Sequence, residues 1–355
     1  MAIVMPFQKK PFYKRVKEPI TLPSKQYQNI FTDDDIKKLS CLHRRKMEQN
    51  KTLAGHISAV LTVLVWGTTF ISTKLLLKDF LPIEILFFRF TLGYLALLLV
   101  YPHRLKLVDK KQEWQFACAG LCGVTLYFLF ENIALTYSMV SNVGVIACVS
   151  PLFIAILAHF FLDGERLKAN FFIGFVAAIA GIVLISFNGS ANFKLSPLGD
   201  ILAVLAAVVW AIYSIIMKKI GAYGYHSIAV TRHIFFYGLL FMLPALFIFD
   251  FRFGFERFTE PTNLFNILFL GLAASALCFA TWNYAVKLLG AVTTSIYIYI
   301  VPVVTVITSV IVLHEQITLV ETLGIALTLI GLVVSEGKIG FRKKAVCTLD
   351  SEETE

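Results

Sequence analysis

Long apolar segments recur along this chain between residues 57 and 335, and they limit the possible folds more than any other feature. A helix that crosses a lipid bilayer needs about 20 mostly apolar residues, and a β-barrel is excluded because these segments are continuous rather than alternating. The sequence therefore predicts an all-α integral membrane protein. The ten expected transmembrane helices cover residues 57–77, 82–101, 114–135, 141–162, 170–187, 199–217, 228–249, 263–286, 292–313 and 319–335.

Composition supports a membrane protein and argues against binding of nucleic acid. Hydrophobic residues make up 57% of the chain and charged residues only 15%, whereas soluble domains carry roughly 25% charged residues. The formal net charge is +9, but the basic residues occur at the termini and in short loops rather than on one amphipathic face. No segment has the spacing of a metal site or a phosphate-binding loop, so we expect neither a metal nor a cofactor.

The second half of the chain repeats the first. Residues 55–74 and 199–218 are identical at nine of twenty positions. Each half contains five expected helices, and because five is odd, the second copy must enter the membrane from the opposite face. Such inverted repeats are typical of secondary transporters, which place the substrate site near the membrane midplane between the halves. The matched polar and aromatic residues are Trp66 with Trp210, Arg89 with Arg232, Asn132 with Asn283, Pro151 with Pro302 and Glu165 with Glu315.

Short motifs in the first half resemble those of a known family. They are Trp66-Gly67-Thr68-Thr69-Phe70, Phe88-Arg89, Asn132-Ile133-Ala134-Leu135, Pro151-Leu152 and Gly164-Glu165-Arg166-Leu167, with fainter echoes in the second half. In this order they resemble the drug/metabolite transporter superfamily with two EamA-type repeats. The resemblance implies a permease that exports or exchanges a small metabolite, an amino acid or a drug across the bacterial inner membrane by alternating access. It implies no enzymatic activity and leaves the substrate open.

The expected organisation is two five-helix repeats, residues 55–190 and 197–337, between an N-terminal tail over 1–50 and a C-terminal tail over 338–355. The N-terminal tail is polar and lysine-rich, so we expect it to be disordered. Lysine and arginine are concentrated in the tails and in the loops on the same side of the membrane. Both termini of this multi-pass cell-membrane protein are therefore expected to lie in the cytoplasm.

The expected partners are a small-molecule substrate and the lipid bilayer, with the protein acting as a monomer or a homodimer. No nucleotide site is visible in the sequence, so transport would draw on a coupled proton or a counter-solute. The alternatives are a membrane-embedded enzyme, or a channel or sensor without coupled transport. An enzyme would need a catalytic cluster within the membrane and a sensor a soluble output domain, and neither is visible in the sequence.

Glu131 is the strongest candidate for a functional residue because it lies deep in the third expected span. A charged group inside a membrane costs about 2.5–3.5 kcal/mol on insertion scales and usually faces a cavity or a partner. Glu131 would suit binding of an amine or a proton, and Tyr127 lies one turn earlier on the same helical face. An ion pair with a neighbouring helix is the structural alternative.

Other polar and aromatic residues within the spans are weaker candidates for substrate binding. Aromatic faces suit planar or cationic ligands and buried amides need partners, although packing explains each residue alone. These candidates are Trp66, Trp210, Trp282, Asn132, Asn142 and Asn283.

Arg89 and Arg232 occupy matched positions in the two repeats, and we expect both to be structural. Their depths in the membrane predict two ion pairs across the repeats, Arg89 with Glu315 and Arg232 with Glu165. Glu131 competes for Arg89, because both lie in the outer half of the membrane.

Overall fold

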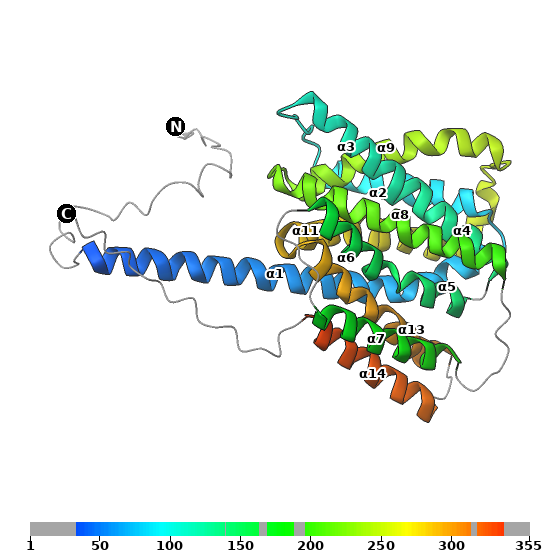
Figure 1. The fold of residues 1–355 in the computed structure, drawn as a ribbon. Helices are drawn as coiled ribbons and strands as arrows, with labels where there is room; N and C mark the ends of the chain where they lie inside the picture. Colours follow the sequence, from blue (N-terminus) through cyan, green and yellow to red (C-terminus); the bar gives the residue numbers. More distant parts are fainter. Residues whose placement is uncertain (1–32, 139, 163–168, 188–195, 314–317, 337–355) are drawn as a thin grey trace, which may run out of the picture. The chain divides into compact units, whose positions relative to one another are not determined.

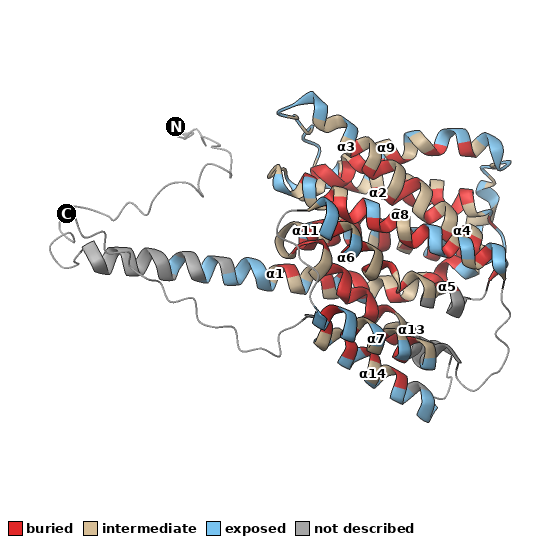
Figure 2. Ribbon diagram, in the orientation of Figure 1, coloured by how far each residue is buried: buried red, intermediate tan, exposed pale blue. Residues whose placement is uncertain are grey.

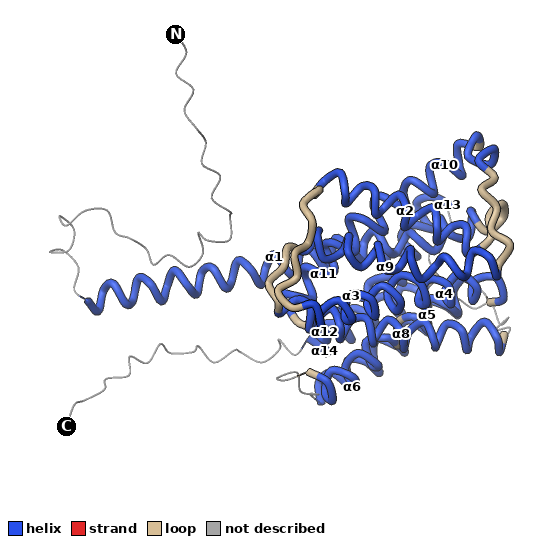
Figure 3. The backbone as a smooth tube through the Cα atoms, turned by 90° about the horizontal axis from the view of Figure 1, so that it is seen from above, coloured by secondary structure: helices blue, strands red, loops and turns tan. Residues whose placement is uncertain are grey.

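The computed structural model describes residues 33–138, 140–162, 169–187, 196–313 and 318–336, and each regular element among them is a helix (Figures 1 and 3). This result confirms the all-α prediction. The chain divides into two compact units, Met1–Lys51 with Lys344–Glu355, and Thr52–Lys343. The second unit contains both halves of the expected repeat.

The first half begins with α1, which extends from Asp33 to Leu76. Residues 33–50 are therefore helical, whereas we expected disorder there, and residues 1–32 lie outside the described part of the chain. Helix α2 starts with Pro82 in its first turn, where the missing N–H of proline costs no hydrogen bond. The remaining elements of this half are α2 (Pro82–Val100), η2 (Lys110–Gln112), α3 (Glu113–Gly120), η3 (Leu121–Leu126), α4 (Tyr127–Tyr137), α5 (Val140–Ala147), α6 (Ser150–Phe161) and α7 (Ala169–Phe187).

The second half follows the same order of elements. Proline again occupies the first turn at the start of the first and third spans, at Pro197 and Pro261. Its elements are α8 (Pro197–Ala222), α9 (Ser227–Ile248), η4 (Phe255–Thr259), α10 (Pro261–Leu268), η5 (Phe269–Leu277), α11 (Cys278–Leu289), α12 (Ala291–Ser295), η6 (Ile296–Tyr299), α13 (Ile300–Leu313) and α14 (Leu319–Glu336).

Six helical stretches in the described chain are long and apolar enough to cross a membrane, three in each half. Four shorter apolar helices, two in each half, correspond to the fourth and fifth expected spans. The ten-span count is therefore clear for six spans and stays a prediction for the other four. The six long stretches are Gln49–Leu76, Pro82–Val100, Lys110–Tyr137, Pro197–Ala222, Ser227–Ile248 and Pro261–Leu289.

The two halves share irregular backbone as well as helices. The third span contains a π-helical stretch in both halves, Leu121–Leu126 and Phe269–Leu277. Asn132 and Asn283 are 151 positions apart in the alignment of the repeats, and the same shift places residues 121–126 on residues 272–277, inside the second stretch. Because π-helical stretches are rare and are frequent at functional sites, their matched position supports a structural repeat.

Helices α7 and α14 lie side by side and join the two halves (Figure 1). A Cβ built on Gly174 would lie 2.2 Å from Ser335 Oγ, and one on Gly331 would lie 2.4 Å from the backbone nitrogen of Ala178. Only glycine permits backbones to approach this closely. The small residues of these two helices therefore form a tight intramolecular contact between the repeats.

Large apolar side chains are exposed on the outer faces of the helices. Buried residues gather on the faces that meet other helices (Figure 2), whereas Phe247 is 86% exposed and Leu99 is 83% exposed. Soluble proteins rarely expose apolar surface on this scale. Lipid is the solvent that such a surface requires, so the chain is a multi-pass integral membrane protein.

Candidate functional site

A cavity lies within the unit that contains both repeats. Its charged and polar lining comes from the first half, and the second half adds apolar and aromatic side chains. The lining residues are Trp66, Thr69, Phe70, Arg89, Tyr127, Phe128, Glu131, Gly144, Ala147, Cys148, Ser150, Trp210, Ile298 and Val301.

Glu131 reaches the cavity from α4, immediately after the π-helical stretch of the third span. Glu131 is only 9% exposed. Tyr127, one turn earlier on the same helix, donates its hydroxyl hydrogen to Glu131 Oε1 at 2.7 Å. Within the described chain no donor reaches Oε2, so half of the carboxylate faces the cavity without a protein partner.

Arg89 reaches the same cavity from α2 and is buried. Its Nε donates to Ser275 Oγ at 3.0 Å, which ties the first half to the π-helical stretch of the second. The guanidinium carbon lies 4.4 Å from the centre of the Phe128 ring, a cation–π contact. Among the described residues, no carboxylate forms an ion pair with Arg89. Arg89 and Glu131 therefore line one cavity and attract each other electrostatically, but they form no ion pair at contact distance.

Aromatic rings from both halves form an apolar wall of the cavity. Trp66 and Trp210, which occupy matched positions in the repeats, meet at 5.5 Å between ring centres with an interplanar angle of 77°. The ring centres of Tyr127 and Trp210 lie 4.8 Å apart. Trp66 Nε1 donates a hydrogen bond to the carbonyl oxygen of Ala274 at 3.1 Å. The hydrogen bond fixes the Trp66 ring, so the wall is rigid and can accept the apolar part of a ligand.

The fourth span of each half is interrupted beside the cavity. In the first half, α5 ends at Ala147 and α6 begins at Ser150, just before Pro151. In the second half, the 3₁₀ turn Ile296–Tyr299 separates α12 from α13, shortly before Pro302. Broken helices expose backbone groups, and membrane proteins tolerate them where they line a cavity. Both interruptions contribute lining residues, at Cys148 and at Ile298.

Several residues that we expected to bind substrate lie outside the cavity lining. Asn283 accepts a hydrogen bond from Tyr213 at 2.7 Å and donates one to Thr231 at 3.0 Å. Asn132 donates to the carbonyl of Pro82 at 3.3 Å. Trp282 is 1% exposed and packs against Trp66, with 5.0 Å between ring centres. The side chain of Asn142 lies outside the described part of the structure, although its backbone belongs to α5.

The two expected ion pairs across the repeats involve Glu315 and Glu165, and both glutamates lie outside the described residues. These pairs therefore stay predictions. Arg232 donates hydrogen bonds to the carbonyl oxygens of Tyr101 and His103, the latter at 2.8 Å. It satisfies backbone carbonyls just beyond the end of α2, which is a structural role away from the cavity.

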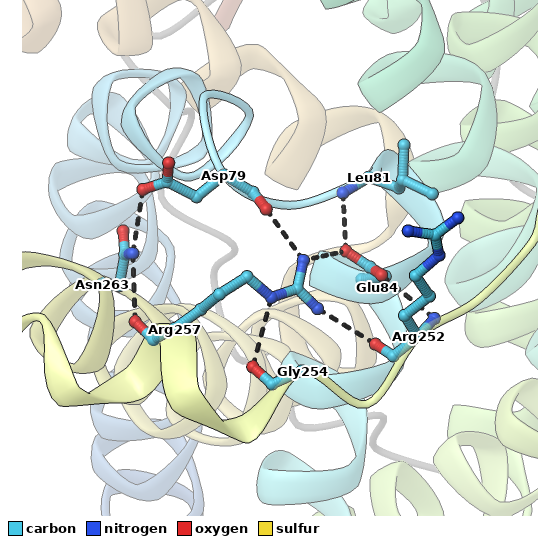
Figure 4. Close-up of polar contacts among 7 residues, drawn as sticks. All are labelled: Asp79, Leu81, Glu84, Arg252, Gly254, Arg257 and Asn263. Atoms are coloured by element: carbon cyan, nitrogen blue, oxygen red, sulfur yellow. Dashed lines mark hydrogen bonds and ion pairs between the residues drawn. The ribbon is translucent and has the colours of Figure 1, made fainter.

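Sequence reasoning missed a second charged cluster, the Glu84 cluster, which surrounds a buried glutamate (Figure 4). It consists of Asp79, Glu84, Arg257 and Asn263 with nearby backbone groups. Glu84 is 1% exposed, less than Glu131 at 9%. Its Oε2 lies 2.7 Å from Arg257 Nη1.

Backbone groups complete the Glu84 cluster. The carboxylate accepts hydrogen bonds from the backbone nitrogens of Leu81 at 2.8 Å and Arg252 at 3.1 Å. Arg257 also donates to the carbonyls of Asp79 at 2.8 Å, Arg252 at 3.0 Å and Gly254 at 3.2 Å. The sequence signal was a glutamate three residues after Leu81 at the start of a proline-initiated helix, but nothing in the sequence indicated Arg257 as its partner.

Comparison with known proteins identifies similar sequences along most of the chain. The profile of the EamA-like transporter family matches residues 53–187 and again residues 197–336. An uncharacterized transporter of Archaeoglobus fulgidus is 28% identical over 292 residues, covering 80% of this chain and 97% of the relative. An uncharacterized transporter of Clostridium kluyveri is 26% identical over 322 residues, which cover 84% of this chain and 99% of the relative. A solved crystal structure with 22% identity has a TM-score of 0.63 and covers 81% of this chain and 96% of its own, which supports the fold alone.

Proposed function

Since this chain belongs to the EamA-like transporter family, we propose that it is a secondary transporter that exports or exchanges a small metabolite, amino acid or drug across the cytoplasmic membrane by alternating access. The observation that carries this proposal is the cavity with Arg89 and Glu131 in its lining. Charged groups inside a membrane are costly and usually mark a substrate or ion pathway. Here they are combined with helix interruptions in both halves, as in transporters with inverted repeats.

The proposed architecture is ten spans in two inverted repeats, residues 55–190 and 197–337. Each half contributes three long and two shorter apolar helices in the same order, with matched π-helical stretches. Because five spans are an odd number, the second repeat would run opposite to the first. The halves could then rock against each other and expose the cavity to either side in turn.

Orientation is part of the proposal, with both termini in the cytoplasm. It rests on the excess of lysine and arginine in the tails and the loops on their side. Single cysteines introduced as Ser190→Cys and Ser351→Cys, after replacement of accessible native cysteines, can be labelled in intact cells with an impermeant maleimide. We expect labelling at position 190 alone, and labelling at position 351 alone would reverse the orientation.

Glu131 is the proposed site for a substrate amine or a coupled proton, with Tyr127 as its positioning partner at 2.7 Å. Trp66 and Trp210 would contact the same substrate from the aromatic wall. A proton or a counter-solute would provide the energy, and one chain with two repeats could act as a monomer or as part of a homodimer.

Counterflow in proteoliposomes tests the proposed function directly. Vesicles that contain the purified full chain are preloaded with an unlabelled solute from a panel of amino acids, nucleosides and cationic drugs, and uptake of the same labelled solute is followed. A secondary transporter shows saturable uptake that is stimulated by the internal solute, whereas a channel shows neither property. If no solute of the panel gives trans-stimulated uptake at any pH gradient, the proposal is wrong.

A further inference from the structure

Arg89 has binding capacity that the protein does not use. Its Nε donates to Ser275, but its two terminal nitrogens have no acceptor among the described residues and the guanidinium lies over the Phe128 ring. A guanidinium presents parallel N–H donors that fit a carboxylate or a phosphate with two hydrogen bonds. Ser275 and Phe128 hold the Arg89 guanidinium in place, so an anionic group of a ligand would bind to a preorganised donor.

Glu131 has the opposite capacity. Tyr127 occupies one carboxylate oxygen, and the other has no donor within the described chain. An ammonium carries three N–H donors and can bind an acceptor of this kind. The tyrosine hydroxyl fixes the carboxylate in the cavity wall, so a cationic group would also meet a prepared site.

Charge balance then decides which ligands the cavity can accept. Arg89 and Glu131 together contribute one positive and one negative charge to the lining. They attract each other electrostatically but form no ion pair at contact distance, so each charge keeps room for a closer partner. Removing a charge from water is costly unless the charge is paired. A ligand with a single charge would pair with one residue and leave the other unpaired. A ligand with both charges would pair with both.

We infer that the cavity binds a zwitterion, with its anionic group at Arg89 and its cationic group at Glu131. This inference rests on the proposed transport function and specifies the class of substrate for the same site. Trp66, Trp210 and Phe70 line the cavity beside the two charges, so the body of the ligand is apolar.

Matched sets of probes test the inference with the purified full chain in detergent. One set is L-leucine, 3-methylbutylamine and 4-methylpentanoate, and a second is L-phenylalanine, 2-phenylethylamine and 3-phenylpropanoate. Each set compares a zwitterion with an amine and an acid of similar shape. Binding is followed by calorimetry and by tryptophan fluorescence, since Trp66 and Trp210 line the cavity.

We expect the zwitterion of at least one set to bind about tenfold or more tightly than both analogues, because each charge-assisted hydrogen bond contributes that much. Equal or tighter binding of an amine or an acid would overturn the inference. Failure of both zwitterions to bind would also overturn it.

Charge variants provide a readout that a structural role would not change. Arg89→Gln should shift the preference toward the amine, and Glu131→Gln should shift it toward the acid. Glu256→Gln is the matched control, because Glu256 is exposed in η4 and does not line the cavity. If Arg89→Gln does not fold by gel filtration, Arg89→Lys replaces it and should keep the zwitterion preference with weaker binding. Unchanged preference in both Gln variants would overturn the inference.

The counterflow assay separates this inference from the proposed function. Trans-stimulated uptake of a singly charged solute, without uptake of zwitterions, would refute the zwitterion site and keep the transport function. Zwitterion binding with the expected charge swaps, without uptake of any solute, would support the site and refute the transport function.

Discussion

Two charged clusters in this protein, each around a buried glutamate, differ in how completely they are paired. In the Glu84 cluster, both carboxylate oxygens and the donors of Arg257 are engaged by side chains or backbone. In the cavity, Arg89 and Glu131 each make one side-chain hydrogen bond, to Ser275 and from Tyr127. Charged groups whose hydrogen bonds are all made within the protein suit a structural role. Charged groups with unused hydrogen-bonding capacity suit a ligand-binding role.

The same contrast separates the two repeats. Glu131 of the first repeat corresponds to Trp282 of the second, which is buried and packs on Trp66. Arg89 lines the cavity, whereas its counterpart Arg232 binds the carbonyls of Tyr101 and His103. Backbone features are shared by both halves, but the charged cavity lining is restricted to one. A ligand is not symmetric, and this explains why the charges need not be.

The largest effect is expected in the Glu84 cluster. Arg257→Gln leaves the buried Glu84 without its countercharge. Because Arg257 is partly exposed and two backbone donors to Glu84 remain, we expect a loss of about 1.5–3 kcal/mol, the range for a hydrogen bond to a charged group. Unfolding of the purified protein in detergent measures the loss. Arg252→Gln is the matched control, because the cluster uses only the backbone of this exposed residue, and it should change stability by less than about 0.5 kcal/mol. Equal stability of the two variants would remove the contrast between the clusters.

The cavity carboxylate should show the opposite behaviour. Glu131→Gln keeps the size of the side chain and removes a charge that one protein hydrogen bond supports, so the melting temperature should change little. Transport should fall by about ten- to hundredfold, since a charge-assisted contact to the ligand contributes about 1.5–3 kcal/mol. Counterflow and thermal unfolding are measured on the same preparations, with the exposed Glu256→Gln as control. Wild-type transport, or destabilisation as large as in Arg257→Gln, would place Glu131 with the structural charges.

Two glycines allow the packing of the core to be compared with the packing of the cavity wall. A Cβ on Gly123 would lie 2.2 Å from the buried ring of Tyr213, whereas a Cβ on Gly144, in the cavity lining, meets nothing within 4 Å. Gly123→Ala should therefore cost about 1–3 kcal/mol of stability through overpacking. Gly144→Ala should fall within about 0.5 kcal/mol and change uptake only through the added methyl group. Comparable losses of stability would mean that the cavity is as tightly packed as the surrounding core.

The smallest effect is the coupling between the two cavity charges. The double-mutant cycle of Arg89→Gln and Glu131→Gln should give a coupling energy of less than about 1 kcal/mol for stability, because the two charges attract each other only from beyond contact distance. The cycle of Glu84→Gln and Arg257→Gln should give a clearly larger value, since their atoms lie 2.7 Å apart. Similar coupling energies in the two cycles would show that Arg89 and Glu131 pair directly in solution.

Much of the fold could be predicted because membrane helices depend on local sequence. The length of the apolar segment alone predicted a helix over residues 82–101, and in the structure α2 extends over Pro82–Val100. The matched prolines marked the fourth spans, which are interrupted in the structure just before Pro151 and Pro302. The π-helical stretches were missed, since no residue type in Leu121–Leu126 or Phe269–Leu277 requires that geometry.

The candidate site could be predicted in part. Glu131, Tyr127, Trp66 and Trp210 were selected from the sequence, and all four line one cavity. That they bind a substrate stays a prediction. Arg89 was assigned a structural role, because its neighbour Ser275 lies 186 positions away and no local pattern connects them. Asn132 and Asn283 were selected as polar residues within spans, but their hydrogen bonds go to protein groups outside the cavity lining.

The sequence by itself determined the membrane-protein class, the positions of the apolar helices and the repeat between the two halves. These properties depend on apolar length and on the order of a few residue types, which are local quantities. Only the tertiary structure decided that Glu84 pairs with Arg257, 173 positions apart, and that Arg89 and Glu131 face the same cavity unpaired. The cost of burying a charge depends on which groups surround it, and helices that are distant in the sequence supply those groups.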